Sequence, residues 1–369
     1  MSELRAMLLD ANERLLKDYC RKEVVLASEG GVWAQALWGA LEAAGITAAV
    51  ASERTGGSGI ELSEALRLAG SAAAFSAPIP LGENYLATWI LGRAGLPTHQ
   101  GPASIAPSNA RDVLSLKRQG AQWRLTGLAR RVPWARHADA VVVVASGDGR
   151  DHVALVPPSG YSVKQGSNIA REARDTLTFD ALLADDVVAP SPDGLQRLDV
   201  HALGAALRTV QLAAALRRTL ELTVRYAQDR EQFGRAISKF QAIQHHLAVL
   251  ASQAAVANAA ADIALESLEP AIGHFNLGAT KVRAGEAASV GAALAHQVHG
   301  AIGFTLEYEL NLHTRRLWSW RDEFGNEAEW SSRVGHRIAA AGSGALWATI
   351  TSAGNASSSA TGTREEVRA

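Results

Sequence analysis

The chain has 369 residues, 47% of them hydrophobic, so it can bury a large core and contain more than one structural unit. Its 36 basic and 37 acidic residues leave a net charge of −1, which argues against nucleic acid or an anionic membrane as a partner. Cys20 is the only cysteine, which excludes an internal disulfide and a cysteine metal site and favours a cytoplasmic location. We expect no membrane span, because no apolar run approaches about 18 residues.

Residues 1–98 are predicted to form an α-helical domain. Pro78 and Pro80 mark a bend between two apolar runs of helical character. A glycine-rich loop at residues 55–59 precedes another helix. No Gly-Lys-Ser or Gly-Lys-Thr follows this loop, so we do not interpret it as a phosphate-binding loop.

Residues 99–193 are predicted to form a small β domain. Short runs rich in strand-forming residues are separated by Gly, Pro and Asp, and they lie at 123–126, 140–145, 152–156 and 161–164. The change from helical to β patterning indicates a separate structural layer.

Residues 194–342 return to long helices and are predicted to form a helical bundle. The first helix has an apolar stripe that repeats every three or four positions, and Arg208 and Gln211 fall outside this stripe. The helix is predicted to end at Gly234, which favours the left-handed conformation found just past helix ends. Arg230 would then lie in the last turn, where the helix dipole favours a cation.

A second amphipathic helix is predicted over residues 240–268. His245 and His246 on this helix predict no metal site, because no carboxylate is placed with them. The final segment, residues 343–369, is rich in Ser, Ala, Thr and Gly and is expected to be disordered.

The turn between these two helices, Tyr226-Ala-Gln-Asp-Arg-Glu-Gln-Phe-Gly-Arg-Ala-Ile-Ser-Lys-Phe-Gln, combines an arginine with aromatic residues and amides. A guanidinium forks onto a pyrophosphate through charge-assisted bonds, although an isolated arginine here would be expected to pair with Asp229 or Glu231. The segment resembles the hairpin of the acyl-CoA dehydrogenase family. This resemblance implies that the hairpin reaches across a dimer interface to the pyrophosphate and adenosine of FAD through Arg230, Gln232, Phe233, Phe240 and Gln241. The two phenylalanines could equally be core residues, and both interpretations stay open.

A second segment, beginning His296-Gln-Val-His-Gly-Ala-Ile-Gly-Phe-Thr-Leu-Glu, follows another alanine-rich helix. Its glycines let backbone amides approach a phosphate or an adenine closely, although Gly-x-x-Gly alone is more often a plain turn. The segment resembles the glutamine, double-glycine and threonine-glutamate stretch of the same family. This resemblance implies that Gln297 and the backbone near Gly300 help to hold the FAD adenosine across the interface. Ala301 stands where the family usually has its second glycine.

The order of helices, β domain and helical bundle is that of the acyl-CoA dehydrogenase family, an α+β fold with a C-terminal four-helix bundle. The resemblance implies FAD-dependent α,β-dehydrogenation of an acyl-CoA thioester, with an electron-transfer flavoprotein as the electron acceptor. The family's Trp-x-Thr on the flavin strand corresponds here to Arg131-Val-Pro133, and a proline cannot donate a backbone hydrogen bond to the flavin. Trp134 either packs on the flavin ring or is a buried strand residue.

The catalytic base departs most from the family pattern. The family's usual base is a glutamate just before a glycine, and Phe324 occupies that position before Gly325. The alternative family position falls near Gly204 and also carries no carboxylate. Glu323 could serve if the loop shifts by one residue. Alternatively, the acidic residues of this segment have a purely structural role on a solvent-exposed surface, where they pair with Arg321 and Arg333.

Three functional hypotheses follow from these departures. The chain is either an FAD-dependent enzyme in its own right, as a dimer or tetramer, or the divergent subunit of a heteromeric acyl-CoA dehydrogenase. The second hypothesis resembles the two-gene enzymes that act on steroid side chains or dicarboxylic acyl-CoA. In it, Arg230, Gln241 and Gln297 are donated to an FAD that is seated mainly on a partner subunit. A third hypothesis is a flavoenzyme of the same fold that resembles nitroalkane oxidases or monooxygenases.

Overall fold

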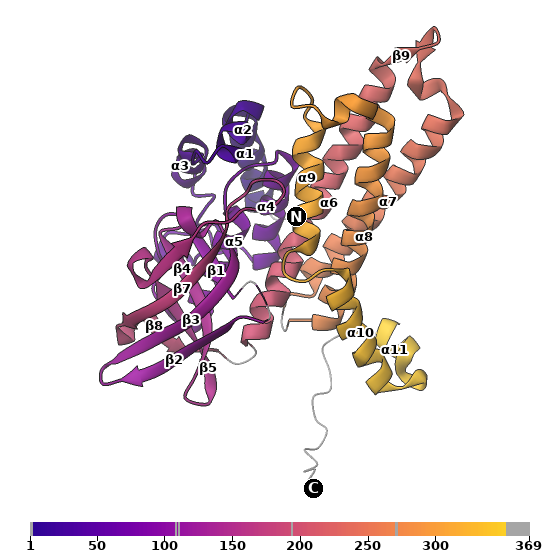
Figure 1. The fold of residues 1–369 in the computed structure, drawn as a ribbon. Helices are drawn as coiled ribbons and strands as arrows, with labels where there is room; N and C mark the ends of the chain where they lie inside the picture. The colour runs from indigo at the N-terminus through magenta and orange to yellow at the C-terminus, as the bar shows by residue number, and fades with distance from the viewer. Residues whose placement is uncertain (1–2, 108, 110, 193–194, 270–271, 352–369) are drawn as a thin grey trace.

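A computed structural model describes residues 3–107, 109, 111–192, 195–269 and 272–351 of the chain. Helices come first, strands follow, and a second set of helices completes the fold, which is the α+β architecture expected from the sequence (Figure 1). The N-terminal helices are α1 (Glu3–Tyr19), α2 (Lys22–Glu29), α3 (Gln35–Ala43), α4 (Leu62–Ala74) and α5 (Leu81–Ala94). The bend predicted at Pro78 and Pro80 separates α4 from α5.

The middle strands form one eight-stranded sheet with the order β6-β7-β3-β2-β4-β5-β8, in which β1 pairs in parallel with β4. Their bounds are β1 (Ala103–Ala106), β2 (Val113–Gln119), β3 (Gln122–Pro133), β4 (Ala140–Gly147), β5 (Arg150–Val156), β6 (Tyr161–Lys164), β7 (Arg174–Leu183) and β8 (Val188–Pro190). The four predicted runs lie within β3, β4, β5 and β6. The valines of β4 alternate between two cores: Val142 and Val144 pack with the helices, whereas Val141 and Val143 pack within the sheet domain. This alternation joins the sheet to the helices.

The C-terminal helices are α6 (Arg197–Asp229), α7 (Gln241–Glu266), α8 (His274–His299), α9 (Leu310–Asp322), α10 (Glu327–Ala341) and α11 (Leu346–Thr351). The first four lie side by side as a bundle, and α6 also packs against α4 and α5 of the N-terminal domain. Small residues allow these helices to approach closely. A Cβ atom at Gly291 of α8 would lie 2.4 Å from the end of the Leu216 side chain of α6, so a larger residue here would force that side chain to move.

The end of α6 differs from the prediction. The helix ends at Asp229 rather than at Gly234, and Arg230 follows it in an extended conformation. The chain then forms a short hairpin from β9 (Glu231–Gln232) and β10 (Arg235–Ala236). Phe233 and Gly234 both have positive φ angles, of 53° and 77°, which are typical of the two central residues of a tight hairpin turn. Gly234 is therefore left-handed as predicted, but it turns a hairpin instead of capping a helix.

Two further segments bear on the predictions. The expected disordered tail begins with helical structure, a short 3₁₀ turn at Ser343–Ala345 and then α11, while residues 352–369 lie outside the described residues. Helix α7 is long and apolar enough to cross a membrane by length and composition alone, with a mean hydropathy of 1.4. One face of α7, including Leu250, Ala254 and Ala257, is buried in the bundle core. We therefore interpret α7 as a bundle helix.

Candidate functional site

Glu323 lies in the short connection between α9 and α10, and its side chain is buried. Its Oε1 atom accepts hydrogen bonds from Arg174 Nε at 2.8 Å and from Asn168 Nδ2 at 3.0 Å. Its Oε2 atom accepts a hydrogen bond from Arg208 Nε at 2.7 Å. Burial alone would raise the pKa of Glu323, but the two arginines and Asn168 lower it to about 2. The carboxylate is therefore ionised and fully engaged by cations.

Arg208 connects this carboxylate to the N-terminal domain. Its Nη2 atom donates to Glu83 of α5 at 2.7 Å, and its Nη1 atom donates to Gln211 at 2.5 Å. Arg208 and Gln211 were expected outside the apolar stripe of α6, but both are buried. The correction has a physical cause: α6 is covered by neighbouring helices on more than one side, so its polar face is not a solvent face.

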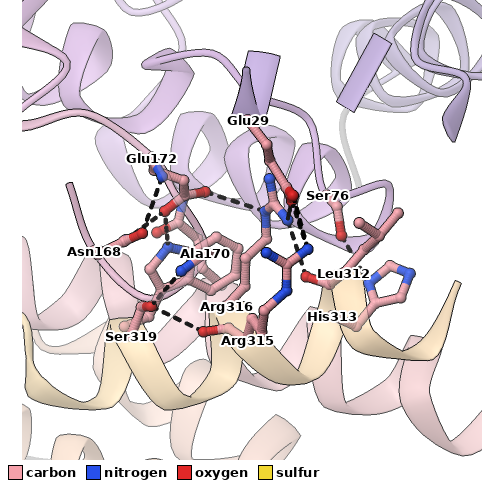
Figure 2. A network of polar contacts seen from close by, with 12 residues as sticks. Glu29, Ser76, Asn168, Ala170, Glu172, Leu312, His313, Arg315, Arg316 and Ser319 are labelled. Carbon is pink, nitrogen blue, oxygen red and sulfur yellow. Dashed lines mark hydrogen bonds and ion pairs between the residues drawn. The ribbon is translucent and has the colours of Figure 1, made fainter. Parts of the chain in front are cut away.

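A second chain of ion pairs runs through Glu172, Arg316 and Glu29 (Figure 2). Glu172 accepts a hydrogen bond from Arg174, which also holds Glu323, at 2.9 Å. Glu172 pairs with Arg316 of α9 at 3.1 Å. Arg316 in turn lies 3.5 Å from Glu29 of α2, and Asn168 also donates to Glu172 at 2.9 Å. Carboxylates and guanidiniums therefore alternate through the N-terminal domain, the sheet domain and the bundle. Such buried pairs are well satisfied only when every partner is in place.

Phe324 occupies the position at which the family pattern places the catalytic base. Its backbone is left-handed, with φ of 53°, and its ring packs directly on Gly204 of α6. A Cβ atom at Gly204 would lie 2.1 Å from the ring, so the ring occupies the space over the alternative base position as well. Lys281 of α8 fixes the same connection by donating to the carbonyl oxygens of Arg321 at 2.5 Å and Gly325 at 2.8 Å.

A small polar cavity of about 110 Å³ lies beside this connection. Its lining brings together the two segments that the sequence singled out separately, namely Arg131 and Pro133 at the end of β3 and Glu323 and Phe324 after α9. Arg131 also has a positive φ angle, 57°, and left-handed non-glycine residues cost energy that functional sites often retain. Trp134 is not part of the lining: it is 4% exposed and Arg174 lies over its ring, so it is a buried residue, the second of the two interpretations.

The remaining acidic residues of the connection differ from Glu323. Glu327 pairs with Arg321 at 2.9 Å, and Glu329 pairs with Arg333 at 2.9 Å, on partly exposed parts of the surface. The expected solvated face of acids and arginines therefore exists for these residues. Glu323 is excluded from it because its partners are two buried arginines of other elements.

The hairpin residues lie at the opposite end of the bundle, where Figure 1 shows β9 at the tip. Four of the residues predicted to bind a cofactor there are exposed, and Phe240 is half-buried; the four are Arg230, Gln232, Phe233 and Gln241. The guanidinium of Arg230 makes no ion pair or hydrogen bond with the residues that the structure describes, so it pairs with neither Asp229 nor Glu231. Phe233 is 93% exposed and contacts Phe240 edge to face at 6.1 Å between ring centres.

The second predicted segment lies next to this hairpin. Ala227, Ile237 and Val298 form one small buried cluster, which packs the base of the hairpin against the end of α8. Tyr226 stacks on His299 with ring centres 4.4 Å apart and donates to its carbonyl oxygen at 3.3 Å. This places three further candidates, Gln297, Gly300 and Ala301, on the same exposed end of the bundle. The structure therefore brings together the residues that the two motifs predict, and these residues could hold an anionic ligand supplied from outside the chain.

The two candidate regions are far apart. Helix α6 has 33 residues and, at a rise of about 1.5 Å per residue, is about 50 Å long. Glu323 and Phe324 pack near its first turns through Gly204 and Arg208, whereas Arg230 follows its last residue. No single ligand of dinucleotide size spans that distance within one chain.

Sequence reasoning missed the residues that hold Glu323, namely Arg174, Arg208 and Asn168. Glu83 offered a signal, because a carboxylate within the apolar α5 segment requires a buried cation. Arg174 and Asn168 offered no such signal. Arg174 lies at the start of β7 and Asn168 just before it, and the sequence periodicity did not identify this strand.

The chain is similar to known acyl-CoA dehydrogenases over most of its length. Residues 199–326 match the family model described as acyl-CoA dehydrogenase, C-terminal domain. The chain is 29% identical over 325 residues to acyl-CoA dehydrogenase IpdE2 of Mycobacterium tuberculosis, covering 85% of this chain and 91% of that protein. It is 28% identical over 323 residues to IpdE2 of Mycolicibacterium smegmatis, covering 86% and 93%.

Solved structures share the fold. The ChsE4-ChsE5 complex from Mycobacterium tuberculosis matches with a TM-score of 0.81 and 22% identity, over 92% of this chain and 98% of the matched chain. The Tcur3481-Tcur3483 steroid ACAD matches with a TM-score of 0.82 and 22% identity over the same shares, 92% and 98%. Together, the matching family model and the sequence relatives make this chain similar to the acyl-CoA dehydrogenases, a family of oxidoreductases, over most of its length.

Proposed function

We propose that this chain is the supporting subunit of a heteromeric, FAD-dependent acyl-CoA dehydrogenase, in which the partner subunit performs the α,β-dehydrogenation. The observation that carries the proposal is the environment of the base position. Phe324 stands where a base would stand, and Glu323 beside it is held by Arg174 and Arg208.

The chemistry of dehydrogenation explains why this environment matters. Removal of the α-proton of a thioester needs a base whose pKa is near the working pH. The carboxylate of Glu323 has a pKa lowered to about 2, and its oxygens are occupied by buried hydrogen bonds, so it is a weak base. The cavity next to it, about 110 Å³, is also smaller than the roughly 300 Å³ at which ligand pockets begin.

The hairpin at the far end of the bundle supports the second part of the proposal, in which this chain helps to hold an FAD bound to the partner subunit. FAD, when bound on the partner, supplies the acceptor for the β-hydride. Arg230 is exposed and without an ion-pair partner among the described residues, which suits a guanidinium that forks onto the pyrophosphate of another subunit's cofactor. Gln241, Gln297 and Gly300 lie on the same end and would contact the adenosine portion. The length of α6 supports the donation of these residues to another subunit's cofactor, because the cavity beside Phe324 in the same chain lies too far from the hairpin.

Relatives and surface composition support a heteromeric assembly. The similar ChsE4-ChsE5 and Tcur3481-Tcur3483 structures are each described with two different subunits, and the latter is described as a steroid ACAD. The outer face of α7 exposes Val249, Val256 and Ile263, which a partner would cover. We infer that the assembly acts on acyl-CoA of lipid or steroid catabolism in the cytoplasm and passes its electrons to an electron-transfer flavoprotein. A relative named the caffeyl-CoA reductase-Etf complex subunit CarC accords with that acceptor.

The test is co-purification of the chain with a homologous neighbouring gene product, followed by measurement of flavin absorbance and anaerobic bleaching by acyl-CoA. We expect flavin and bleaching only in the complex. Arg230→Ala should weaken FAD retention by about 1.5 to 3 kcal/mol, the value of a charged hydrogen bond. Arg217→Ala, at an exposed arginine in the middle of α6, serves as the matched control.

The outcome that contradicts the proposal is also specific. If the chain alone binds FAD and is bleached by an acyl-CoA, it is a complete enzyme. A second test uses Glu323→Gln in the complex: unchanged turnover supports a base on the partner, whereas a loss of several decades identifies Glu323 as the base and contradicts the proposal.

A further inference from the structure

A polar cavity of about 730 Å³ lies between the N-terminal helices and the start of the sheet. Its walls come from α5, from the turn that follows α3, and from the segments that precede β1 and β4, on which α5 packs (Figure 1). It shares no lining residue with the cavity beside Phe324, whose Asn109 follows the opposite end of β1. Its volume lies within the range of about 300 to 1,000 Å³ that is typical of small-molecule sites.

The turn that forms one wall is held in place by its own backbone. Ala51 N donates to Ala48 O at 2.9 Å, and Gly59 N donates to Ala51 O at 2.9 Å. Gly57 lies so close to this turn that a Cβ atom there would be 2.1 Å from the carbonyl oxygen of Ala51. Because that oxygen belongs to the backbone, only glycine fits at this position. The wall of the cavity is therefore formed before any ligand arrives.

Two buried threonines of the lining have hydroxyl groups without partners. Thr47 in the turn is 6% exposed, and Thr88 on α5 is 7% exposed. Neither hydroxyl makes a hydrogen bond with a residue that the structure describes, and neither is sealed off from solvent. Thr209 of α6 behaves differently, because its hydroxyl donates to the carbonyl oxygen four residues earlier at 2.8 Å. Buried polar groups normally have partners, so the partner of these two hydroxyls comes from the cavity.

The charges of the lining favour a cation. Glu42 of α3 and Asp139 before β4 contribute carboxylates, whereas no lysine or arginine occurs among the described residues of the lining. Neither carboxylate makes an ion pair or a hydrogen bond with a residue that the structure describes. Burial lowers the pKa of His99, also in the lining, below its ordinary value of 6.5, so this imidazole brings no positive charge at pH 7. Gly101 leaves room for Asp139, whose Oδ2 atom lies 2.1 Å from where a Cβ atom would be.

An ammonium group matches this set of side chains. It has hydrogen-bond donors and no acceptor, whereas a carboxylate has only acceptors and a hydroxyl has two lone pairs. No group of three or more metal-ligating side chains occurs among the described residues, so a metal ion would lack ligands here. A groove of about 700 Å³ adjoins the cavity at Thr88 and is lined in part by Val50, Trp89 and Leu96. This apolar side of the groove suits a carbon chain attached to the ammonium group.

We propose that this cavity binds the ammonium group of a small aliphatic amine. Glu42 and Asp139 supply the negative charge, and the hydroxyls of Thr47 and Thr88 accept hydrogen bonds from the ammonium group. The carbon chain of the amine runs into the adjoining groove, against Val50 and the other apolar residues there. The site uses no residue of the hairpin or of the Glu323 region, so it stands whether or not a partner performs the dehydrogenation.

The experiment measures ligand binding to the full-length chain by saturation-transfer NMR and isothermal titration calorimetry. Putrescine and spermidine are the amine probes, and the neutral probe is a butanediol with its hydroxyl groups at the two chain ends. We expect saturable binding of at least one amine and none of the diol. Asp139→Asn should weaken amine binding by about tenfold or more, because it removes a charge-assisted bond. Thr88→Val keeps the side-chain shape but removes the hydroxyl, and it should weaken binding by about threefold or more.

Asp148→Asn is the matched control, since it removes an exposed aspartate at the other end of β4, and it should leave amine binding unchanged. Circular dichroism checks that each variant is folded. Absence of saturable amine binding, or equal binding by the wild type, Asp139→Asn and Thr88→Val, overturns the site. Equal affinity for the diol and the amines overturns the assignment of a cationic ligand. This readout contains no flavin step, so its failure would leave the flavin test of the proposed function unaffected.

Discussion

At the scale of single residues, Glu323 illustrates how neighbours decide the chemistry of a side chain. A carboxylate moved from water into a protein interior is destabilised, and it remains charged only when cations and donors replace the water. Arg174, Arg208 and Asn168 provide that replacement. The same contacts that keep the carboxylate ionised also lower its basicity, and this is the physical reason for our proposal that the partner subunit supplies the base.

Arg208→Met should therefore be strongly destabilising. The substitution leaves Glu323 and Glu83 buried with fewer compensating charges, and removal of one partner from a buried pair typically costs about 3 to 5 kcal/mol. Urea unfolding followed by circular dichroism measures the free energy of unfolding. Arg217→Met, at the exposed position of the same helix, should change it by less than about 0.5 kcal/mol. Equal stability of the two variants would contradict the role assigned to the buried pair.

Acid sensitivity follows from the same carboxylate. The pKa of Glu323 in the folded chain is about 2, below its ordinary value of 4.5, so its contribution to stability is complete above pH 4.5 and is lost as the pH falls towards 2. The contribution is on the order of 3 kcal/mol. Unfolding curves of the wild type and Glu323→Gln between pH 5 and pH 2.5, roughly the window of this titration, should converge as the pH falls. Parallel curves would show that Glu323 is not the group responsible.

At the scale of elements, the connection between α9 and α10 is held by a lysine of a third helix. Lys281 is fully buried and donates to the carbonyls of Arg321 and Gly325. Burial lowers the pKa of Lys281 to about 8, although Glu327, Glu323 and Asp322 oppose this shift. The lysine thus compensates backbone groups that the turn between two helices leaves without helical partners.

Lys281→Met should destabilise the chain at pH 7 by about 2 kcal/mol, because two buried carbonyls lose their donor. The folded pKa of about 8 lies below the ordinary value of 10.5, so the stability of the wild type rises with pH across that interval while that of the variant does not. The difference in unfolding free energy should therefore be larger at about pH 10 than at pH 7. Lys164→Met on the exposed face of β6 provides the control. A difference that stays constant with pH would exclude Lys281 as the titrating group.

The elements also show where sequence reasoning succeeds and where it stops. The long apolar stripe of α7 and the valine run of β4 were predictable, because each matches the period of one regular structure. The burial of Arg208 was not, since a helix surrounded on several sides has no face that periodicity alone can label as polar. The end of α6 was misplaced by five residues because Gly234 suits a helix end and a tight hairpin turn equally well. Phe324 at the base position was visible in the sequence, whereas the arginines that neutralise Glu323 come from distant segments.

At the scale of the whole molecule, the chain leaves apolar surface uncovered along one side of the bundle. Val249, Val256 and Ile263 are each more than a third exposed on α7, whose other face is buried in the core. The three residues are seven positions apart and so lie on one side of the helix, where a partner subunit would cover them. Together with the exposed hairpin, this face favours an assembly in which a second subunit packs alongside α7.

Ile263→Lys should disrupt that assembly without unfolding the chain, because a lysine on an already exposed position costs little in the isolated subunit but buries a charge in the interface. Size-exclusion chromatography with light scattering measures the mass of the complex, and circular dichroism checks the fold. Val163→Lys, at a comparably exposed valine of the sheet domain, should leave the mass unchanged. A normal complex with Ile263→Lys would place the subunit interface elsewhere.

The length of α6 allows the two ends of the chain to accept amino-acid substitutions independently. A helix of 33 residues acts as a rigid spacer between the Phe324 region and the Arg230 hairpin, with no contact shared between them. Substitutions more than about 10 Å apart without common partners usually act independently, so neither end constrains the amino acids accepted at the other. Substitutions near Phe324 can therefore remove catalytic activity while the Arg230 hairpin still binds a neighbouring subunit. Two copies of a duplicated gene can in this way come to encode subunits with different roles in one enzyme.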